Sequence, residues 1–159
     1  TPFGDQLAWL KNDLEKASKN RDAVPWIIVS GHRPVYSSAL IDYPLRARSH
    51  LRSLLEPLFD QYNVDIYFSG HMHLYESSHP LRNGKVVPTD GTRYIVAGNA
   101  GNKEGLGRFN TIKPAWSSVR EHNHHGFGLL TVKGRCSLTW RAVGAEDDSI
   151  LDEFTVTRC

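Results

Sequence analysis

The chain has 159 residues, of which 40% are hydrophobic and 23% are charged. This composition is ordinary for a globular protein and excludes a chain that is disordered throughout. Lysine and arginine number 19 against 17 aspartates and glutamates, without a basic block. The longest apolar run falls far short of the ~20 residues that a membrane-spanning helix needs. We therefore expect neither a nucleic-acid partner nor a membrane partner.

The first half of the chain predicts helices alternating with strands. Leucines spaced three and four residues apart predict an amphipathic helix over residues 4–18. The β-branched run 26–30 predicts a strand buried on both faces. A second apolar stripe predicts a helix over residues 45–62, which Pro57 should kink or interrupt. The next strand is predicted at residues 64–68.

The second half predicts mainly strands. Residues 94–97 predict a third strand, which is followed by a segment rich in glycine and asparagine. Residues 109–125 have weak periodicity and predict a long loop. Tight turns then separate three further predicted strands, at residues 127–132, 136–143 and 151–157. The fold class is therefore α/β layering followed by an antiparallel meander, within one domain.

The two cysteines leave two states open. A hairpin register that pairs Leu138 with Val156 places Cys136 opposite Arg158 and turns Cys159 to the other face of the sheet. A bulge or a frayed terminus would bring the two sulfurs together. The register alone therefore permits both a disulfide and two free thiols.

The strongest chemical signal is a pair of histidines after the predicted strand 64–68. Gly70 precedes His71 and His73, and the glycine permits a tight turn at which a ligand can approach the backbone. Residues i and i+2 of extended backbone point to the same side, so the two imidazoles can converge. Taken alone, this pattern is also explained by a chance pair in a loop.

A third histidine follows another predicted strand. His32 comes directly after Gly31, at the end of the run 26–30. If the two strands are parallel neighbours, their carboxyl ends meet at one edge of the sheet, where α/β folds place their sites. Imidazole is a common ligand for zinc, iron and manganese. We interpret the three histidines together as a metal site.

The residues around these histidines resemble the purple acid phosphatases, which belong to the calcineurin-like metallophosphoesterases. Residues 29–32 match the family's V-x-x-H motif, and residues 70–73 match its G-H-x-H motif. The Tyr75–Glu76 pair and the glycine-rich segment 91–105 also resemble the family, and the motifs occur in the family's order. The resemblance extends over nearly the whole chain.

This resemblance implies the C-terminal half of a four-layer α/β/β/α sandwich, with residues 1–159 forming part of the catalytic domain. His32 and His71 would bind a divalent metal (zinc, iron or manganese), and His73 would bind iron(III). Such a dinuclear centre hydrolyses phosphomonoesters, because two metals lower the pKa of water and neutralise phosphate charge. The resemblance also implies a secreted, lysosomal or vacuolar location.

Three histidines cannot hold two metals, and trivalent iron prefers oxygen ligands. The family supplies those ligands from G-D-x-G, G-D-x-x-Y and G-N-H-[DE] motifs. The nearest sequences here are Gly4–Asp5, Gly98–Asn99 and Gly101–Asn102, and they fit none of these motifs. We therefore expect the missing ligands in an N-terminal half of the same protein. The isolated chain should be inactive or nearly so, bind at most one divalent metal weakly through His32 and His71, and self-associate through open strand edges.

Other residues receive weaker interpretations. Tyr75 and Glu76 are expected to brace the histidine turn, and His50 to lie exposed on the second helix. The catalytic acid stays unassigned. Two alternative functions remain: another calcineurin-like phosphodiesterase or nucleotidase, and a non-catalytic metal-binding or interaction module. The polar residues that could contact substrate at the rim of the site are His122, His124, His125, Asn99 and Asn102.

Overall fold

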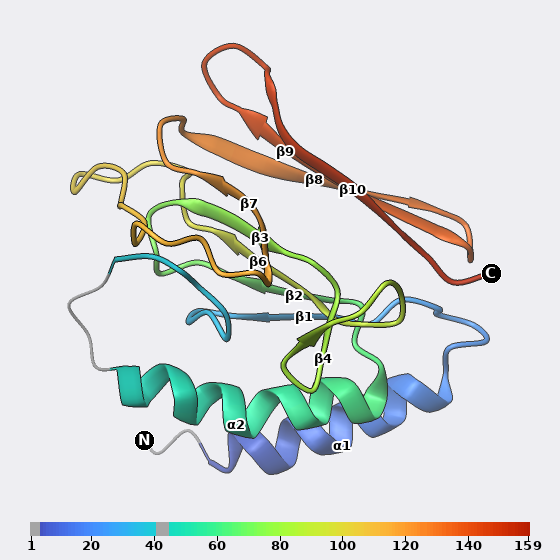
Figure 1. Cartoon of the computed structure of the whole chain (residues 1–159). Coiled ribbons are helices and arrows are strands. Elements are labelled where there is room, and N and C mark those ends of the chain that lie inside the picture. Colours follow the sequence, from blue (N-terminus) through green and yellow to red (C-terminus); the bar gives the residue numbers. More distant parts are fainter. Residues whose placement is uncertain (1–3, 41–44) are drawn as a thin grey trace.

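The structure is a computed structural model, and it describes residues 4–40 and 45–159. Two helices cover one side of a five-stranded sheet, and a three-stranded sheet lies on its other side (Figure 1). These layers confirm the predicted α/β class and fit the C-terminal half of a metallophosphoesterase sandwich. The elements are α1 (Gln6–Lys19), β1 (Ile28–Gly31), α2 (Leu45–Tyr62), β2 (Ile66–Ser69), β3 (Tyr75–Ser78), β4 (Leu81–Arg82), β5 (Lys85–Val86), β6 (Arg93–Ala97), β7 (Ser117–Glu121), β8 (Gly126–Lys133), β9 (Ser137–Gly144) and β10 (Ile150–Thr157).

The five-stranded sheet has the strand order β1-β2-β6-β3-β7. β1, β2 and β6 run parallel, and β3 and β7 are antiparallel to their neighbours. Gly31 is the register partner of Ser69. The predicted parallel pairing is thereby confirmed, and the carboxyl ends of β1 and β2 lie side by side.

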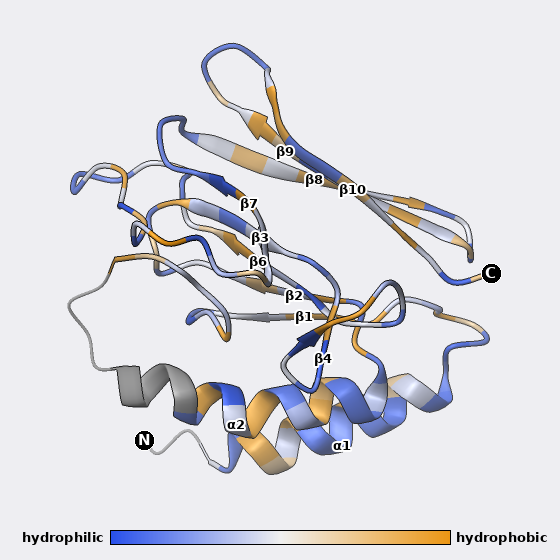
Figure 2. Ribbon diagram, viewed as in Figure 1, coloured by the Kyte–Doolittle hydropathy of each residue, from blue (hydrophilic) through white to orange (hydrophobic). Residues whose placement is uncertain are grey.

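The two helices form where the sequence predicted them. The Asp5 side chain caps α1 by accepting a hydrogen bond of 3.0 Å from the backbone N–H of Ala8. Each helix alternates between hydrophobic and hydrophilic residues (Figure 2). Leu14 of α1 and Phe59 of α2 pack together with Tyr67 of the sheet. Neither helix in the described part of the chain is long and apolar enough to cross a membrane.

Two details of the first half differ from expectation. α2 continues through Pro57, so of the predicted kink or interruption the interruption does not occur. β1 is not buried on both faces: its residues alternate between exposed and half-buried, and Ile28 is 39% exposed. The reason is its place at the edge of the sheet, where only one of its faces packs against the helices.

Two strands of the five-stranded sheet were not predicted. β7 lies inside the segment 109–125 that was expected to be a loop, and β3 follows the histidine turn directly. All four residues of β3 are buried, yet three of them are polar. A buried strand of this composition shows no apolar alternation, so periodicity could not reveal it.

The three-stranded sheet has the strand order β10-β9-β8, with Leu138 opposite Val156 as predicted. Its inner face packs on the central sheet, where Leu138, Trp140 and Ala142 contact Ile66 and other buried residues. Three hydrogen bonds link strand side chains of the two sheets in the described residues. Trp140 Nε1 donates to the Tyr75 hydroxyl at 2.8 Å, and the hydroxyls of Tyr75 and Ser77 each donate to Asp152 at 2.6 Å.

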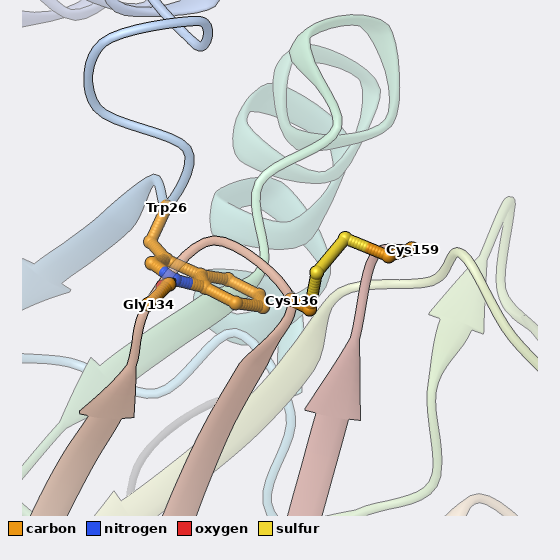
Figure 3. Close-up of a disulfide and its surroundings, with 4 residues drawn as sticks. All are labelled: Trp26, Gly134, Cys136 and Cys159. Atoms are coloured by element: carbon orange, nitrogen blue, oxygen red, sulfur yellow. A yellow bond between two sulfur atoms is a disulfide. The ribbon is translucent and has the colours of Figure 1, made fainter.

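Cys136 and Cys159 form a disulfide, which decides the question left open by the sequence. Their Cα atoms are 5.1 Å apart. The backbone N–H of Arg158 donates to the carbonyl of Cys136, so the predicted register holds and Cys159 lies beyond the end of β10, where it can turn back. Close by, the indole N–H of Trp26 donates to the Gly134 carbonyl at 3.2 Å (Figure 3).

Candidate metal centre

His32 and His71 lie next to each other at the carboxyl edge of the central sheet. Each follows a parallel strand, and the strand register brings their rings together, with 3.0 Å between His32 Nε2 and His71 Nδ1. Two nitrogens bound to one tetrahedral zinc at ~2.0–2.1 Å are roughly 3.3 Å apart. The spacing of this pair is compatible with one shared divalent ion. Metal binding by His32 and His71, which the family resemblance implies, stays a prediction.

The turn that carries the histidines is shaped by His71 itself. His71 has a backbone φ of 64°, in the left-handed region that few non-glycine residues adopt. Gly70 itself has no positive φ, and close approach of a ligand to its backbone stays a prediction. Gly98 is the glycine that the turn requires, because a Cβ there would lie 1.9 Å from the Met72 carbonyl oxygen.

The surroundings of His71 favour its neutral form. Burial lowers the pKa of His71, and the guanidinium of Arg33 and the neighbouring imidazoles of His32 and His73 act in the same direction. The Arg33 Nη1 atom lies 3.3 Å from His71 Nε2. A neutral imidazole is the form that binds a metal, so this environment suits a ligand.

His73 stands apart from that pair in its contacts. Its Nδ1 atom lies 3.5 Å from a carboxylate oxygen of Glu104, in the glycine-rich segment. A carboxylate beside a ligand histidine commonly fixes the ring orientation. Within residues 4–40 and 45–159, no group of three or more His, Cys, Asp or Glu side chains is arranged to hold a metal. The predicted trio is thus a pair and a separate histidine.

The rim residue Asn99 is mainly structural. It is 3% exposed, its side-chain amide donates to the carbonyl of His124, and its own carbonyl lies 3.2 Å from His125 Nδ1. Asn102 closes a local turn, in which its Oδ1 atom accepts from the backbone N–H of Glu104. Contact of Asn99 or Asn102 with substrate stays a prediction.

The remaining rim histidines also have local contacts. The ring of His122 packs edge-on against Phe109, with 5.4 Å between centroids. His124 Nδ1 lies 3.3 Å from a carboxylate oxygen of Glu121. His50 is exposed on α2, as expected. Contact with substrate by the histidines at 122, 124 and 125 stays a prediction.

Comparison with known proteins shows which protein family this fold resembles. The profile described as calcineurin-like phosphoesterase matches residues 1–75, and the one described as iron/zinc purple acid phosphatase-like protein C matches residues 91–153. A solved structure of purple acid phosphatase PPD1 from yellow lupin (Lupinus luteus) seeds superposes with a TM-score of 0.82 at 26% identity, over 99% of this chain and 29% of the lupin chain.

The curated relatives of the chain include acid phosphatases and purple acid phosphatases. An acid phosphatase of Aspergillus ficuum is 33% identical over 97% of this chain and 27% of its own length. Purple acid phosphatase 21 of Arabidopsis thaliana is 36% identical over 98% of this chain and 36% of its own length. The chain belongs to the purple acid phosphatase family of calcineurin-like phosphoesterases. It spans well under half the length of these relatives.

Proposed function

We propose that the chain supplies the histidine ligands of a dinuclear metal centre that hydrolyses phosphomonoesters. The observation that carries this proposal is the 3.0 Å separation between His32 Nε2 and His71 Nδ1 at the ends of two parallel strands. The acid phosphatases and purple acid phosphatases among the relatives support the reaction type.

Each residue of the site has a role in this proposal. His32 and His71 would hold a divalent ion of zinc, iron or manganese, and His73 would serve iron(III) with its ring oriented by Glu104. When bound, the two metals would lower the pKa of water and neutralise phosphate charge. Arg33 adds a cation next to His71, which suits an anionic substrate.

We further propose that residues 1–159 are the C-terminal portion of the catalytic domain. The oxygen ligands that iron(III) prefers would come from an N-terminal half of the same protein, so the isolated chain would be inactive. The share of the relatives that the chain spans fits this arrangement. The disulfide suits the secreted, lysosomal or vacuolar location of the proposal, because disulfides persist in oxidising compartments.

The test is zinc titration of the chain by calorimetry, with hydrolysis of p-nitrophenyl phosphate measured in parallel. We expect one zinc ion per chain, no turnover, and loss of binding in His71→Asn. Asparagine tolerates the positive φ of this position, so the variant removes the ligand and keeps the turn. Zinc binding that persists in His71→Asn would contradict the proposal, and robust turnover would contradict the half-domain.

We also propose that the isolated chain self-associates through its open edge. β1 is an edge strand, and an apolar cavity of about 780 Å³ lies beside it, between the two helices. Trp9 on its rim is 65% exposed. Exposed apolar surface next to an unpaired strand favours association with a second copy.

Light scattering after size exclusion tests this proposal. Wild-type chain should elute as dimer or larger, and Trp9→Glu should shift it toward monomer. Ile112→Lys is the matched control, because Ile112 is 81% exposed and does not line the cavity. A monomeric wild-type chain would refute self-association.

A further inference from the structure

Glu76 is a buried carboxylate next to the histidine turn, and its side chain is oriented away from the three-stranded sheet's polar links. It is 1% exposed and lies in β3, three residues after His73. One carboxylate oxygen accepts from the backbone N–H of Ser38 at 2.7 Å. The other accepts from the hydroxyls of Ser38 at 2.5 Å and Ser117 at 2.7 Å.

Ser38 belongs to the segment that leaves His32, and this segment is fixed at both of its ends. Near the histidine, the backbone N–H of Gly70 donates to the His32 carbonyl at 3.2 Å, and the Tyr67 hydroxyl donates to the Arg33 carbonyl at 2.8 Å. At the other end, Glu76 holds Ser38. The carboxylate thus connects the segment of the first ligand with the strand that follows the second.

We propose that Glu76 is a positioning residue of the metal centre, which holds the His32 segment against the His71 turn and thereby sets the affinity for the divalent ion. This inference rests on the proposed metal site. In this role Glu76 does more than brace the histidine turn, because it also holds the His32 segment and thereby controls zinc affinity.

The energetics favour a role in specifying geometry. Burial of a carboxylate is costly unless several donors satisfy it, and an apolar side chain would often stabilise the fold as well. Glu76 receives three donors, two of them from Ser38. A hub of this kind favours one arrangement of the joined segments, and two ligand nitrogens 3.0 Å apart need such an arrangement.

Two serine variants separate positioning from general stability. Ser38→Ala and Ser117→Ala each remove one hydroxyl donor to the same carboxylate oxygen, and both serines are 3% exposed. Only Ser38 lies in the His32 segment. We expect zinc affinity to fall about threefold to tenfold in Ser38→Ala and less than about twofold in Ser117→Ala, with similar losses of stability in the metal-free chains.

Variants of Glu76 itself give the larger effect. Glu76→Met keeps the length of the side chain and removes both acceptors, so zinc affinity should fall about tenfold or more, as for loss of other groups that orient metal ligands. Glu76→Gln should be milder, because its amide can turn its oxygen toward the Ser38 N–H and its NH₂ toward the hydroxyls.

Calorimetric zinc titration gives the affinities, and urea unfolding of the metal-free chain reports stability separately. Equal zinc affinities in wild type, Ser38→Ala and Glu76→Met would overturn the inference, as would equal losses in the two serine variants. If Glu76→Met does not fold, the comparison of zinc affinity between Ser38→Ala and Ser117→Ala tests the inference. A wild-type chain that binds no zinc would instead refute the proposed metal site on which the inference rests.

Discussion

The two sheets of this molecule are built on different principles. The strands of the three-stranded sheet have eight residues each, follow one another along the chain and end in a disulfide. In the central sheet, β1 and β2 have four residues each, and a whole helix separates them in sequence. The three-stranded sheet contributes apolar burial and a covalent link, whereas the central sheet positions His32 and His71, the proposed metal ligands. Stability and metal affinity should therefore respond to changes in different sheets.

The largest effect on stability is expected from the three-stranded sheet. Leu138 is 0% exposed in the core between the sheets. Leu138→Ala should lower the free energy of unfolding by about 2–5 kcal/mol, through lost burial and the cavity left behind. Zinc affinity of the folded chain should stay within about twofold of wild type. Urea unfolding measures the free energy of unfolding, and zinc titration measures the affinity. If Leu138→Ala lowered both, the two sheets would not have separate roles in stability and metal affinity.

Reduction of the disulfide should rank second. The bridged cysteines are 23 positions apart, and a loop of this length stabilises by roughly 3 kcal/mol through the entropy of the unfolded chain. Thermal unfolding with and without dithiothreitol should show the loss in wild type. Cys136→Ser/Cys159→Ser should be insensitive to the reductant. If reduction leaves the midpoint unchanged, the bridge does not contribute to stability.

A change in the central sheet should act on the site instead. Gly98→Ala would place a Cβ at 1.9 Å from the Met72 carbonyl, so the histidine turn must move. Zinc affinity should fall at least about tenfold, or ~1.4 kcal/mol. Gly70→Ala is the control in the same turn, because a Cβ there meets no atom within 4 Å. Zinc titration of Gly98→Ala and Gly70→Ala tests this prediction. Equal zinc affinities in the two variants would contradict it.

The smallest effect concerns Tyr67 and depends on pH. Burial raises the pKa of Tyr67 to about 12, so the unfolded chain loses this phenol proton first. Stability from the protonated phenol is complete below about pH 10 and is lost as pH rises through about 12. Tyr67→Phe should cost about 1 kcal/mol at pH 8, through the lost bond to Arg33.

Urea unfolding of wild type and Tyr67→Phe across this range measures the difference between them. The gap should shrink between pH 10 and pH 12, because only the wild type has the Tyr67 proton to lose. A gap that stays constant up to pH 12 would show that the Tyr67 phenol does not titrate differently in the folded chain.

The sequence predicted those parts of the fold in which local pattern decides. The helices and the three strands of the meander follow from apolar periodicity, and the register of Leu138 with Val156 follows from alternation. The convergence of His32 with His71 followed from their shared place at strand ends. The buried face of β1 was misjudged, because a β-branched run does not show whether its strand lies at an edge.

Long-range polar contacts could not be found in this way. Three of the four residues of β3 are polar, so its sequence does not predict a buried strand. Its Glu76 carboxylate can be buried because Ser38 and Ser117, which are far away in sequence, donate hydrogen bonds to it. The proximity of Glu104 to His73 likewise depends on the path of a glycine-rich segment, which has no periodicity to interpret. Only the placement of these carboxylates in three dimensions shows what each of them holds.

The paired contacts of Tyr75 and Glu76 have a consequence for transfer of this site to other proteins. These neighbouring residues bond in opposite directions, one to Asp152 of the outer sheet and the other to Ser38 and Ser117. A graft of the four-residue histidine motif alone would lack all of these contacts. The smallest set of residues that could be transferred is therefore discontinuous. A host scaffold must offer an acceptor for the Tyr75 hydroxyl on one face of the receiving strand and donors for the Glu76 carboxylate on the other.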